Sequence, residues 1–512
     1  MRKRIPSDGR WIGSIPLIAA TFFMLILLVF SSQADAFDPT TGVHKTILPN
    51  GIRVLVMERP ISPTVSLYIR HRAGAVDDLT SRTGAAHLLE HMMFKGTTTI
   101  GTVDYQAEES LRRRISEARS TLKRVLEREG DESSEAKELA EKIDRLEEEK
   151  RSLIVSNEID RLYRERGGVG LNASTGYELT TYMVNLPANA LELWARIEVD
   201  RLMNPVFREF FSERDVVIEE RRQVVDSRTE RQLRELFLGT AFIAHPYGRP
   251  ILGWSDDIAR LDIDYLTRFF HSLYRPANMV IAVVGDVTNS EVLSLINNYF
   301  GALEPSPADD LLTRSATIEP PQRGERRAVL TSSANPRLIM GFKKPTAPAR
   351  EDYIFDIIEN ILTGGRSSRL YRSLVIEKEL AGDVFAVNGS PGILYENLFM
   401  VEAEPLDGVS LADLESAILD EFERLKQTPV SRRELQKAKN GIRADLYRML
   451  DSNSGIASVL SYFEATLGDY GYLSTYLDHI DSIEADDIQS AAAEYFVKKN
   501  RTAALLEREE TP

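Results

Sequence analysis

Alternation of apolar and polar residues begins near residue 44 and predicts the start of an antiparallel sheet. Three short runs have this pattern, at 45–48, 52–56 and 65–69. An Asn50-Gly51 turn separates the first two runs, and a further apolar run at 279–284 completes the strands expected of the first domain. Apolar residues at helical spacing predict two helices between these strands, at 191–203 and 212–226.

A highly charged region between residues 105 and 163 has the apolar spacing of two long helices. Apolar residues recur there every three or four positions among many Arg and Glu residues, and Gly130 with the polar residues after it interrupts the pattern. We therefore predict an inserted helical hairpin that projects from the first domain. Its charge is typical of a solvated surface, and a docking site for a partner protein is the less favoured alternative.

The order of elements begins again after a stretch rich in proline and charged residues. This stretch, 301–327, is predicted to be an interdomain linker. Strand and helix patterns then recur, at 338–342, 353–362 and 398–403. We predict an α+β fold of two similar domains, 37–300 and 328–512, each a mixed, mainly antiparallel sheet with helices packed on it. The second domain has no metal-binding motif.

The first 36 residues have the pattern of a secretion signal. Four basic residues precede or adjoin an apolar run from Trp11 to Phe30, and Ala34-Asp35-Ala36 has small residues where a signal peptidase reads. We predict cleavage before Phe37 and export to the periplasm or out of the cell. The alternative is an uncleaved segment that anchors the chain in a membrane, because the run is nearly long enough to span one.

Charge and cysteine content exclude several classes of function. The formal net charge of -15 leaves no basic excess that could displace counterions from nucleic acid, so we expect no nucleic-acid partner. The chain contains no cysteine, which excludes disulfides, a cysteine nucleophile and thiolate ligands for zinc. Any metal ion must therefore be held by histidine and carboxylate side chains.

The sequence His87-Leu88-Leu89-Glu90-His91 presents the residues that such a metal site needs. Two histidines four positions apart lie one turn from each other on the same face of a helix, so both imidazoles can reach one ion. The order H-x-x-E-H is the inverted form of the H-E-x-x-H zinc motif. Apolar neighbours would pack this helix on the sheet and leave His87, Glu90 and His91 along one exposed stripe.

A later helix carries a second acidic pattern. Glu213 and Glu220 are seven residues apart, which is two helical turns, so their side chains share a face. Glu219 points about 100° away from that face.

These residues belong to a longer series of motifs. The chain resembles the pitrilysin or insulinase family of zinc metallopeptidases, in particular bacterial members with two domains per chain that are related to the mitochondrial processing peptidase. The matching segments cover nearly the whole chain after residue 36: Leu48-Pro49-Asn50-Gly51, 84–97, Asn172-Ala173-Ser174-Thr175, Asn204-Pro205-Val206-Phe207, 213–220, His245-Pro246-Tyr247-Gly248, Tyr274-Arg275-Pro276, Gly285-Asp286 and 365–370.

The resemblance implies a role for each matching residue. His87, His91 and Glu220 would hold one zinc ion per chain, with Glu213 supporting the site. Glu90 would be the general base that activates a zinc-bound water for peptide hydrolysis. The separation of His87 from Glu220 is longer than is usual in the family, and the inserted hairpin accounts for the excess.

The resemblance also implies a substrate and a partner. Substrates would be extended peptides or unfolded polypeptides that lie along four residues of an edge strand, Asn172, Ala173, Ser174 and Thr175. The chain would form a homodimer, or a heterodimer with a related chain, and would meet a membrane only through an uncleaved N-terminal segment. Two alternatives stay open: a catalytic subunit that is active only with a partner chain, and a non-catalytic scaffold of the same fold.

Overall fold

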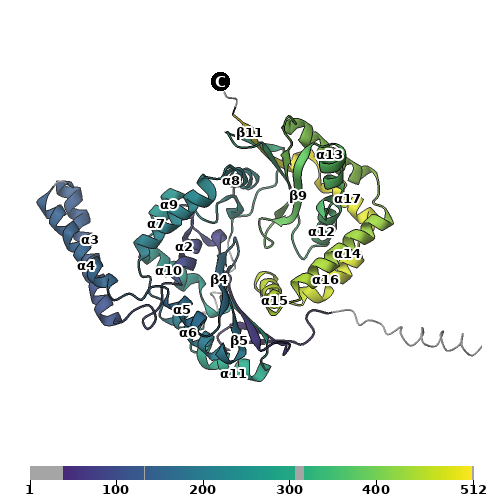
Figure 1. Cartoon of the computed structure of the whole chain (residues 1–512). Helices are drawn as coiled ribbons and strands as arrows, with labels where there is room; N and C mark the ends of the chain where they lie inside the picture. Colours follow the sequence, from purple (N-terminus) through teal and green to yellow (C-terminus); the bar gives the residue numbers. More distant parts are fainter. Residues whose placement is uncertain (1–37, 132, 306–315, 510–512) are drawn as a thin grey trace, which may run out of the picture.

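The chain folds into two halves, each built on one sheet, as seen in a computed structural model (Figure 1). The structure describes residues 38–131, 133–305 and 316–509. The predicted signal segment, 1–36, lies outside the described residues, as does part of the predicted linker. Within the described ranges, no helix is both long enough and apolar enough to cross a membrane.

The sheet of the first half has six strands in the order β1-β2-β6-β3-β5-β4. The strands are β1 (Val43–Ile47), β2 (Arg53–Glu58), β3 (Thr64–His71), β4 (Val169–Thr175), β5 (Thr180–Pro187) and β6 (Met279–Gly285). Only the β2 and β6 pair is parallel, so the sheet is mixed and mainly antiparallel, as predicted. Strand β6 is buried along its whole length, whereas β4 forms one edge and is half exposed.

Helices cover one face of this sheet and form the first core with it. They are α2 (Ala85–Met92), α6 (Leu191–Met203), α7 (Phe210–Arg221), α10 (Ile263–Leu273) and α11 (Asn289–Phe300). The α-helix predicted at 212–226 ends early, because a π-helical turn occupies 222–226. On α7, Val217 is buried in the core but Val216 points to solvent, so α7 contributes a narrower apolar stripe than its sequence indicates.

The second half repeats this plan with five strands in the order β7-β11-β8-β10-β9. The strands are β7 (Arg326–Ser332), β8 (Arg337–Lys344), β9 (Ala381–Ser390), β10 (Asn397–Pro405) and β11 (Arg501–Arg508). Helices that pack on one face of the sheet or close around it are α12 (Arg350–Thr363), α13 (Leu411–Gln427), α14 (Arg432–Met449), α16 (Tyr472–Asp481) and α17 (Ala485–Tyr495).

Two helices cross from one half to the other and cover the remaining face of each sheet. Helix α8 (Thr229–Ala241) belongs to the first half but packs on β7, β8 and β11 of the second half. Helix α15 (Asn453–Leu467) belongs to the second half but packs on β3 and β6 of the first half. Each half therefore completes the core of the other.

The charged region forms a projecting hairpin of α3 (Tyr105–Glu129) and α4 (Ser134–Arg151), as Figure 1 shows. The prediction that the second helix continues to residue 163 is wrong. Helix α4 ends at Arg151, and a separate short helix, α5 (Glu158–Glu165), follows. The apolar residues Ile159 and Tyr163 continue the helical spacing but serve the core of the first half, not the hairpin.

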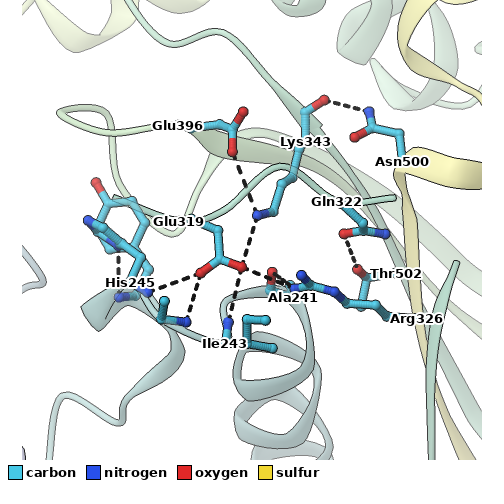
Figure 2. A network of polar contacts seen from close by, with 12 residues as sticks. Ala241, Ile243, His245, Glu319, Gln322, Arg326, Lys343, Glu396, Asn500 and Thr502 are labelled. Atoms are coloured by element: carbon cyan, nitrogen blue, oxygen red, sulfur yellow. Dashed lines mark hydrogen bonds and ion pairs between the residues drawn. The ribbon is translucent and has the colours of Figure 1, made fainter. Parts of the chain in front are cut away.

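Glu319, which lies in the predicted linker, binds the two halves together (Figure 2). The buried Glu319 carboxylate accepts hydrogen bonds from the backbone N–H groups of Ile243, Ala244 and His245, which follow α8. It also pairs with Arg326 on β7 and Lys343 on β8. Burial opposes ionisation of Glu319, but these bonds and the nearby lysine outweigh it and hold the pKa at about 2.

Candidate metal and catalytic site

The helix with the two histidines is held by its N-terminal end. The buried Asp78 carboxylate accepts hydrogen bonds from the backbone N–H groups of Gly84, at 2.7 Å, and Ala86, at 3.0 Å. Gly84 has a φ of 87°, and a β-carbon there would lie 2.6 Å from the carbonyl oxygen of Leu252, so only glycine fits. Asp78 was not anticipated from the sequence, because it caps α2 from beyond the usual capping position.

The structure brings His87, His91 and Glu220 together. One ligand atom of each lies within 4.8 Å of the others, and among the described residues no other group of His, Asp and Glu side chains meets this criterion. The Nε2 atoms of His87 and His91 lie 3.8 Å and 3.4 Å from the same Glu220 oxygen, Oε2. The three residues come from α2 and α7, which pack against each other.

Glu213 and Glu219 have different surroundings. Glu213 Oε1 lies 3.0 Å from His91 Nδ1, while its other oxygen lies 2.5 Å from Lys95 Nζ. Glu219 points away from the histidines and binds Arg222 in an exposed pair. Lys95 belongs to the motif 84–97, but its contact with Glu213 cannot be inferred from sequence spacing.

Glu90 lies beside the three clustered residues and contacts the edge strand. Its Oε2 atom accepts a hydrogen bond of 2.5 Å from Thr175 Oγ1 at the end of β4. Burial raises the pKa of Glu90, although the Thr175 hydrogen bond works in the opposite direction. The prediction that His87, Glu90 and His91 form an exposed stripe is wrong: His87 is buried and the other two are half-buried, because α7 and β4 pack over α2.

The pKa values of the two histidines are shifted in opposite directions. Burial, assisted by the neighbouring His91, lowers the pKa of His87 to about 4. Burial also disfavours protonation of His91, but hydrogen bonds to Glu213 and Glu220 outweigh it and raise the pKa to about 9. Neutral imidazoles bind metal ions, so a metal ion at this site would compete with a proton for His91.

The remaining predicted residues lie along β4 next to Glu90. Asn172, Ala173 and Ser174 pair with β5 on one side only, and β4 is the last strand of its sheet. The strand therefore presents an edge to which an extended chain could add by backbone hydrogen bonding.

The donor atoms fit a zinc ion. Two imidazole nitrogens and one carboxylate oxygen are the set found in sites with three protein ligands and one open coordination position. Glu213 contacts the other ring nitrogen of His91, and Lys95 contacts Glu213, which is the arrangement that commonly surrounds a metal-binding histidine.

Two family models match the chain, one on each side of residue 255. The first, described as "Insulinase (Peptidase family M16)", matches residues 53–111 and 152–254. The second, described as "Peptidase M16 inactive domain", matches residues 260–442. The gap in the first match, 112–151, contains most of α3 and all of α4, which marks the hairpin as an addition to the family pattern.

Curated proteins and solved structures resemble the chain over most of its length. Zinc protease PqqE of Helicobacter pylori is 26% identical over 498 residues, which cover 96% of this chain and 98% of that protein. The crystal structure of a protease from Helicobacter pylori has a TM-score of 0.76, with 24% identity over 91% of this chain and 99% of that chain. The first half of the periplasmic protease PqqL from Escherichia coli has a TM-score of 0.66, with 18% identity over 92% of each chain. These two structures establish the two-domain fold.

Proposed function

Because the chain belongs to the insulinase family of peptidases, M16, we propose that it is a zinc-dependent endopeptidase that hydrolyses extended peptides or unfolded polypeptides. The observation that carries the proposal is the convergence of His87, His91 and Glu220 beside the half-buried carboxylate of Glu90. Packing of two helices does not by itself require two imidazoles and two carboxylates to converge at one point.

In this proposal His87, His91 and Glu220 hold one zinc ion per chain, and Glu213 fixes the orientation of His91. When bound, zinc would supply Lewis-acid activation of a water molecule and of the peptide carbonyl group. Histidine and carboxylate are the only strong zinc ligands available, because the chain has no cysteine.

Glu90 is the general acid and base of the proposed reaction. It takes a proton from the attacking water and returns it to the leaving amine, which requires a carboxyl group that exchanges protons near neutral pH. Burial raises the pKa of Glu90 in the required direction. The Thr175 hydroxyl holds one carboxylate oxygen in place, so the other oxygen is free for proton transfer.

Strand β4 is the proposed binding surface for the substrate backbone. An extended peptide that pairs with Asn172, Ala173 and Ser174 would run past Glu90, because Thr175 at the end of the same strand contacts that residue. Recognition through backbone hydrogen bonds favours unfolded segments over a particular sequence.

Location and assembly belong to the same proposal. Export is supported by the basic and apolar pattern of residues 1–36 and by the likeness to the periplasmic protease PqqL. We further propose that the chain acts as a homodimer or as a heterodimer with a related chain.

The proposal is tested on the purified chain with two measurements, zinc content and cleavage of an unstructured fluorogenic peptide. The parental chain is expected to bind one zinc ion and to cleave. Glu90→Gln should keep the zinc and lose cleavage by about a thousandfold or more. Glu219→Gln is the matched control, since Glu219 lies next to Glu220 in the chain but faces solvent.

Each outcome selects one of the alternatives. Zinc without cleavage by the parental chain would assign it as a subunit that needs a partner, and addition of the related chain should then restore activity. Absence of zinc would overturn the peptidase proposal in favour of a scaffold. Cleavage by Glu90→Gln at the parental rate would remove Glu90 from its proposed role.

A further inference from the structure

The second half repeats the architecture of the metal site without its ligands. Five strands of each sheet correspond in order and direction: β2, β6, β3, β5 and β4 of the first half match β7, β11, β8, β10 and β9 of the second. Helix α12 contacts edge strand β9 and helix α14, as α2 contacts edge strand β4 and helix α7. Helix α12 is therefore the counterpart of α2.

The correspondence extends to individual residues. Asp356-Ile357-Ile358-Glu359-Asn360 on α12 has the spacing of His87-Leu88-Leu89-Glu90-His91 on α2. Glu359 Oε2 accepts a hydrogen bond of 2.6 Å from the backbone N–H of Asn388 on β9, just as Glu90 accepts one from Thr175 on β4. The carboxylate and its contact with the edge strand have therefore been kept, while both imidazoles are absent.

The counterpart region cannot hold a metal ion in the same way. Helix α14 places Gly441 against α12, where a β-carbon would lie 2.8 Å from the Asn360 Nδ2 atom, so no carboxylate corresponds to Glu220. Within the described ranges, three potential ligand atoms converge only at the first site.

A pocket occupies this place in the second half, with a volume of about 450 Å³. Its walls include four aromatic side chains from α15 and α16: Tyr462, Phe463, Tyr472 and Tyr476. Asp356, Glu359 and Asn388 also line it. A pocket of this size with aromatic walls and a few polar groups is typical of a small-ligand site.

The polar groups of the pocket have an excess of negative charge and of hydrogen-bond acceptors. Asp352 is paired with the buried Lys344, and Asp445 is paired with Arg448. Among the residues that the structure describes, no ion pair is made by Asp356 or Glu359, which feel the charge of Lys344 only at longer range. The buried Oδ1 atom of Asn388 receives no hydrogen bond. Asp356 and Glu359 already accept hydrogen bonds from Asn388 and Tyr476, so a ligand that carries a positive charge and donates hydrogen bonds would offset the charge of both carboxylates and supply the missing donor to Asn388 Oδ1.

Two further features agree with such a ligand. Burial raises the pKa of Asp356 to about 6 and that of Glu359 to about 7, so a bound cation would offset the cost of holding both carboxylates in the charged form. Arg70, which lines the pocket from β3, donates its hydrogen bonds to Ser458, Ser461 and Thr181 and pairs with neither carboxylate.

We propose that this pocket binds the cationic side chain of a lysine or arginine residue in the polypeptide substrate. The ammonium or guanidinium group would contact Asp356, Glu359 and Asn388 Oδ1, and its alkyl stem would lie against the tyrosine rings. Strand β9 is the edge of its sheet, so the peptide backbone can add to it while a side chain enters the pocket. This inference rests on the proposed peptidase function and names a second, non-catalytic subsite for it.

The test measures binding and not turnover. The zinc-loaded Glu90→Gln chain is titrated into a labelled, unstructured peptide, and fluorescence anisotropy gives the affinity. Two peptides are compared: one contains a single lysine, and the other has norleucine at that position. The lysine peptide should bind on the order of tenfold more tightly, the effect of a hydrogen bond to a charged group. Glu359→Gln and Asp356→Asn, each added singly, should bring the lysine peptide to the affinity of the norleucine peptide and leave the latter unchanged.

Matched controls separate the pocket from general electrostatics. Glu423→Gln removes the same charge from an exposed pair with Lys426 and should leave the tenfold preference intact. Circular dichroism confirms folding, and either pocket variant that keeps the parental spectrum is sufficient for the test.

Three results would overturn the inference. The first is equal binding of the two peptides by the Glu90→Gln chain. The second is a lysine preference that survives a pocket substitution in a variant that keeps the parental spectrum. The third is tighter binding of free cadaverine than of the lysine peptide, which would assign the pocket to a small amine. Failure of the proposed function is seen separately: a parental chain that neither binds zinc nor cleaves, in parallel with an intact lysine preference, would remove the peptidase role and keep the pocket.

Discussion

The two halves of the chain place the same strands, helices and edge contacts around two very different groups of side chains. In the first half, α2 and α7 direct two histidines and a glutamate at one point. In the second half, α12 and α14 meet in the same way, but Asp356, Asn360 and Gly441 stand at the corresponding places. The comparison shows that the fold supplies a position next to an edge strand, whereas three side chains decide whether a metal can be held there.

The comparison also shows why the second half is kept although it has no metal ligands. Helix α15 covers the inner face of the first sheet through residues such as Leu460, and α8 covers the second sheet through Phe237. Each half would expose a large apolar sheet face without the other. The two halves therefore form one folding unit that carries different side chains at corresponding positions.

The largest effect is expected at Glu220, whose place in the second half is taken by Gly441. Glu220→Ala should abolish stoichiometric zinc binding, lowering the affinity by at least about a hundredfold, because only two ligands would remain. Zinc content after equilibration with a chelator measures this. Glu219→Ala should bind zinc normally, and equal losses in both variants would show that the effect is not coordination.

The next effect concerns α8, the helix of the first half that packs on the sheet of the second half. Phe237→Ala should reduce the free energy of unfolding by about 3–5 kcal/mol, because a fully buried ring between α8 and the second sheet is lost. Urea denaturation measures the change. Ile243→Ala, which removes an exposed side chain just after α8, should stay within about 0.5 kcal/mol. A Phe237→Ala cost that small would show that α8 is not part of the shared core.

A smaller effect of opposite sign is expected in the pocket of the second half. Burial raises the pKa of Glu359 from 4.5 to about 7, so ionised Glu359 destabilises the fold as the pH rises through this interval. Glu359→Gln keeps the acceptor for the Asn388 N–H and should stabilise the chain by about 1–3 kcal/mol at pH 8. The gain should disappear near pH 4, and a gain that does not depend on pH would contradict this explanation.

The smallest effect is expected at the contact between Glu90 and the edge strand. Thr175→Val should lower kcat by about tenfold, since the hydrogen bond that orients the Glu90 carboxylate is removed. Zinc content should not change, because Thr175 is not among the clustered ligand residues. Thr175→Ser retains the hydroxyl and should recover most of the rate; a Ser variant as slow as Val would assign the loss to packing.

Local patterns in the sequence predicted much of the architecture. The boundaries of α6 and the strand textures of β1, β2, β3 and β6 follow from short-range periodicity, which depends on the neighbours of each residue. Periodicity gave a wrong prediction where one continuous apolar spacing belongs to two different parts of the fold, the hairpin and the core of the first half. Ile159 and Tyr163 continue the spacing of the hairpin, yet they lie in the core of the first half, because the chain turns after Arg151.

The sequence by itself determined the type of chemistry and the candidates for it. The H-x-x-E-H spacing places two imidazoles and a carboxylate within one helical turn, and the absence of cysteine restricts the ligands to histidine and carboxylate. The seven-residue spacing of Glu213 and Glu220 places both on one face of a helix.

Only the tertiary structure decided which residues meet across the fold. The contact of Lys95 with Glu213, the cap of α2 by Asp78, the exchange of α8 and α15, and the pocket around Glu359 all join residues from separate elements. Helical and strand periods specify which way a side chain faces, but the packing of whole elements specifies what it faces. The pocket of the second half exists because α12 lies in the place that α2 occupies in the first half, and no local pattern specifies that placement.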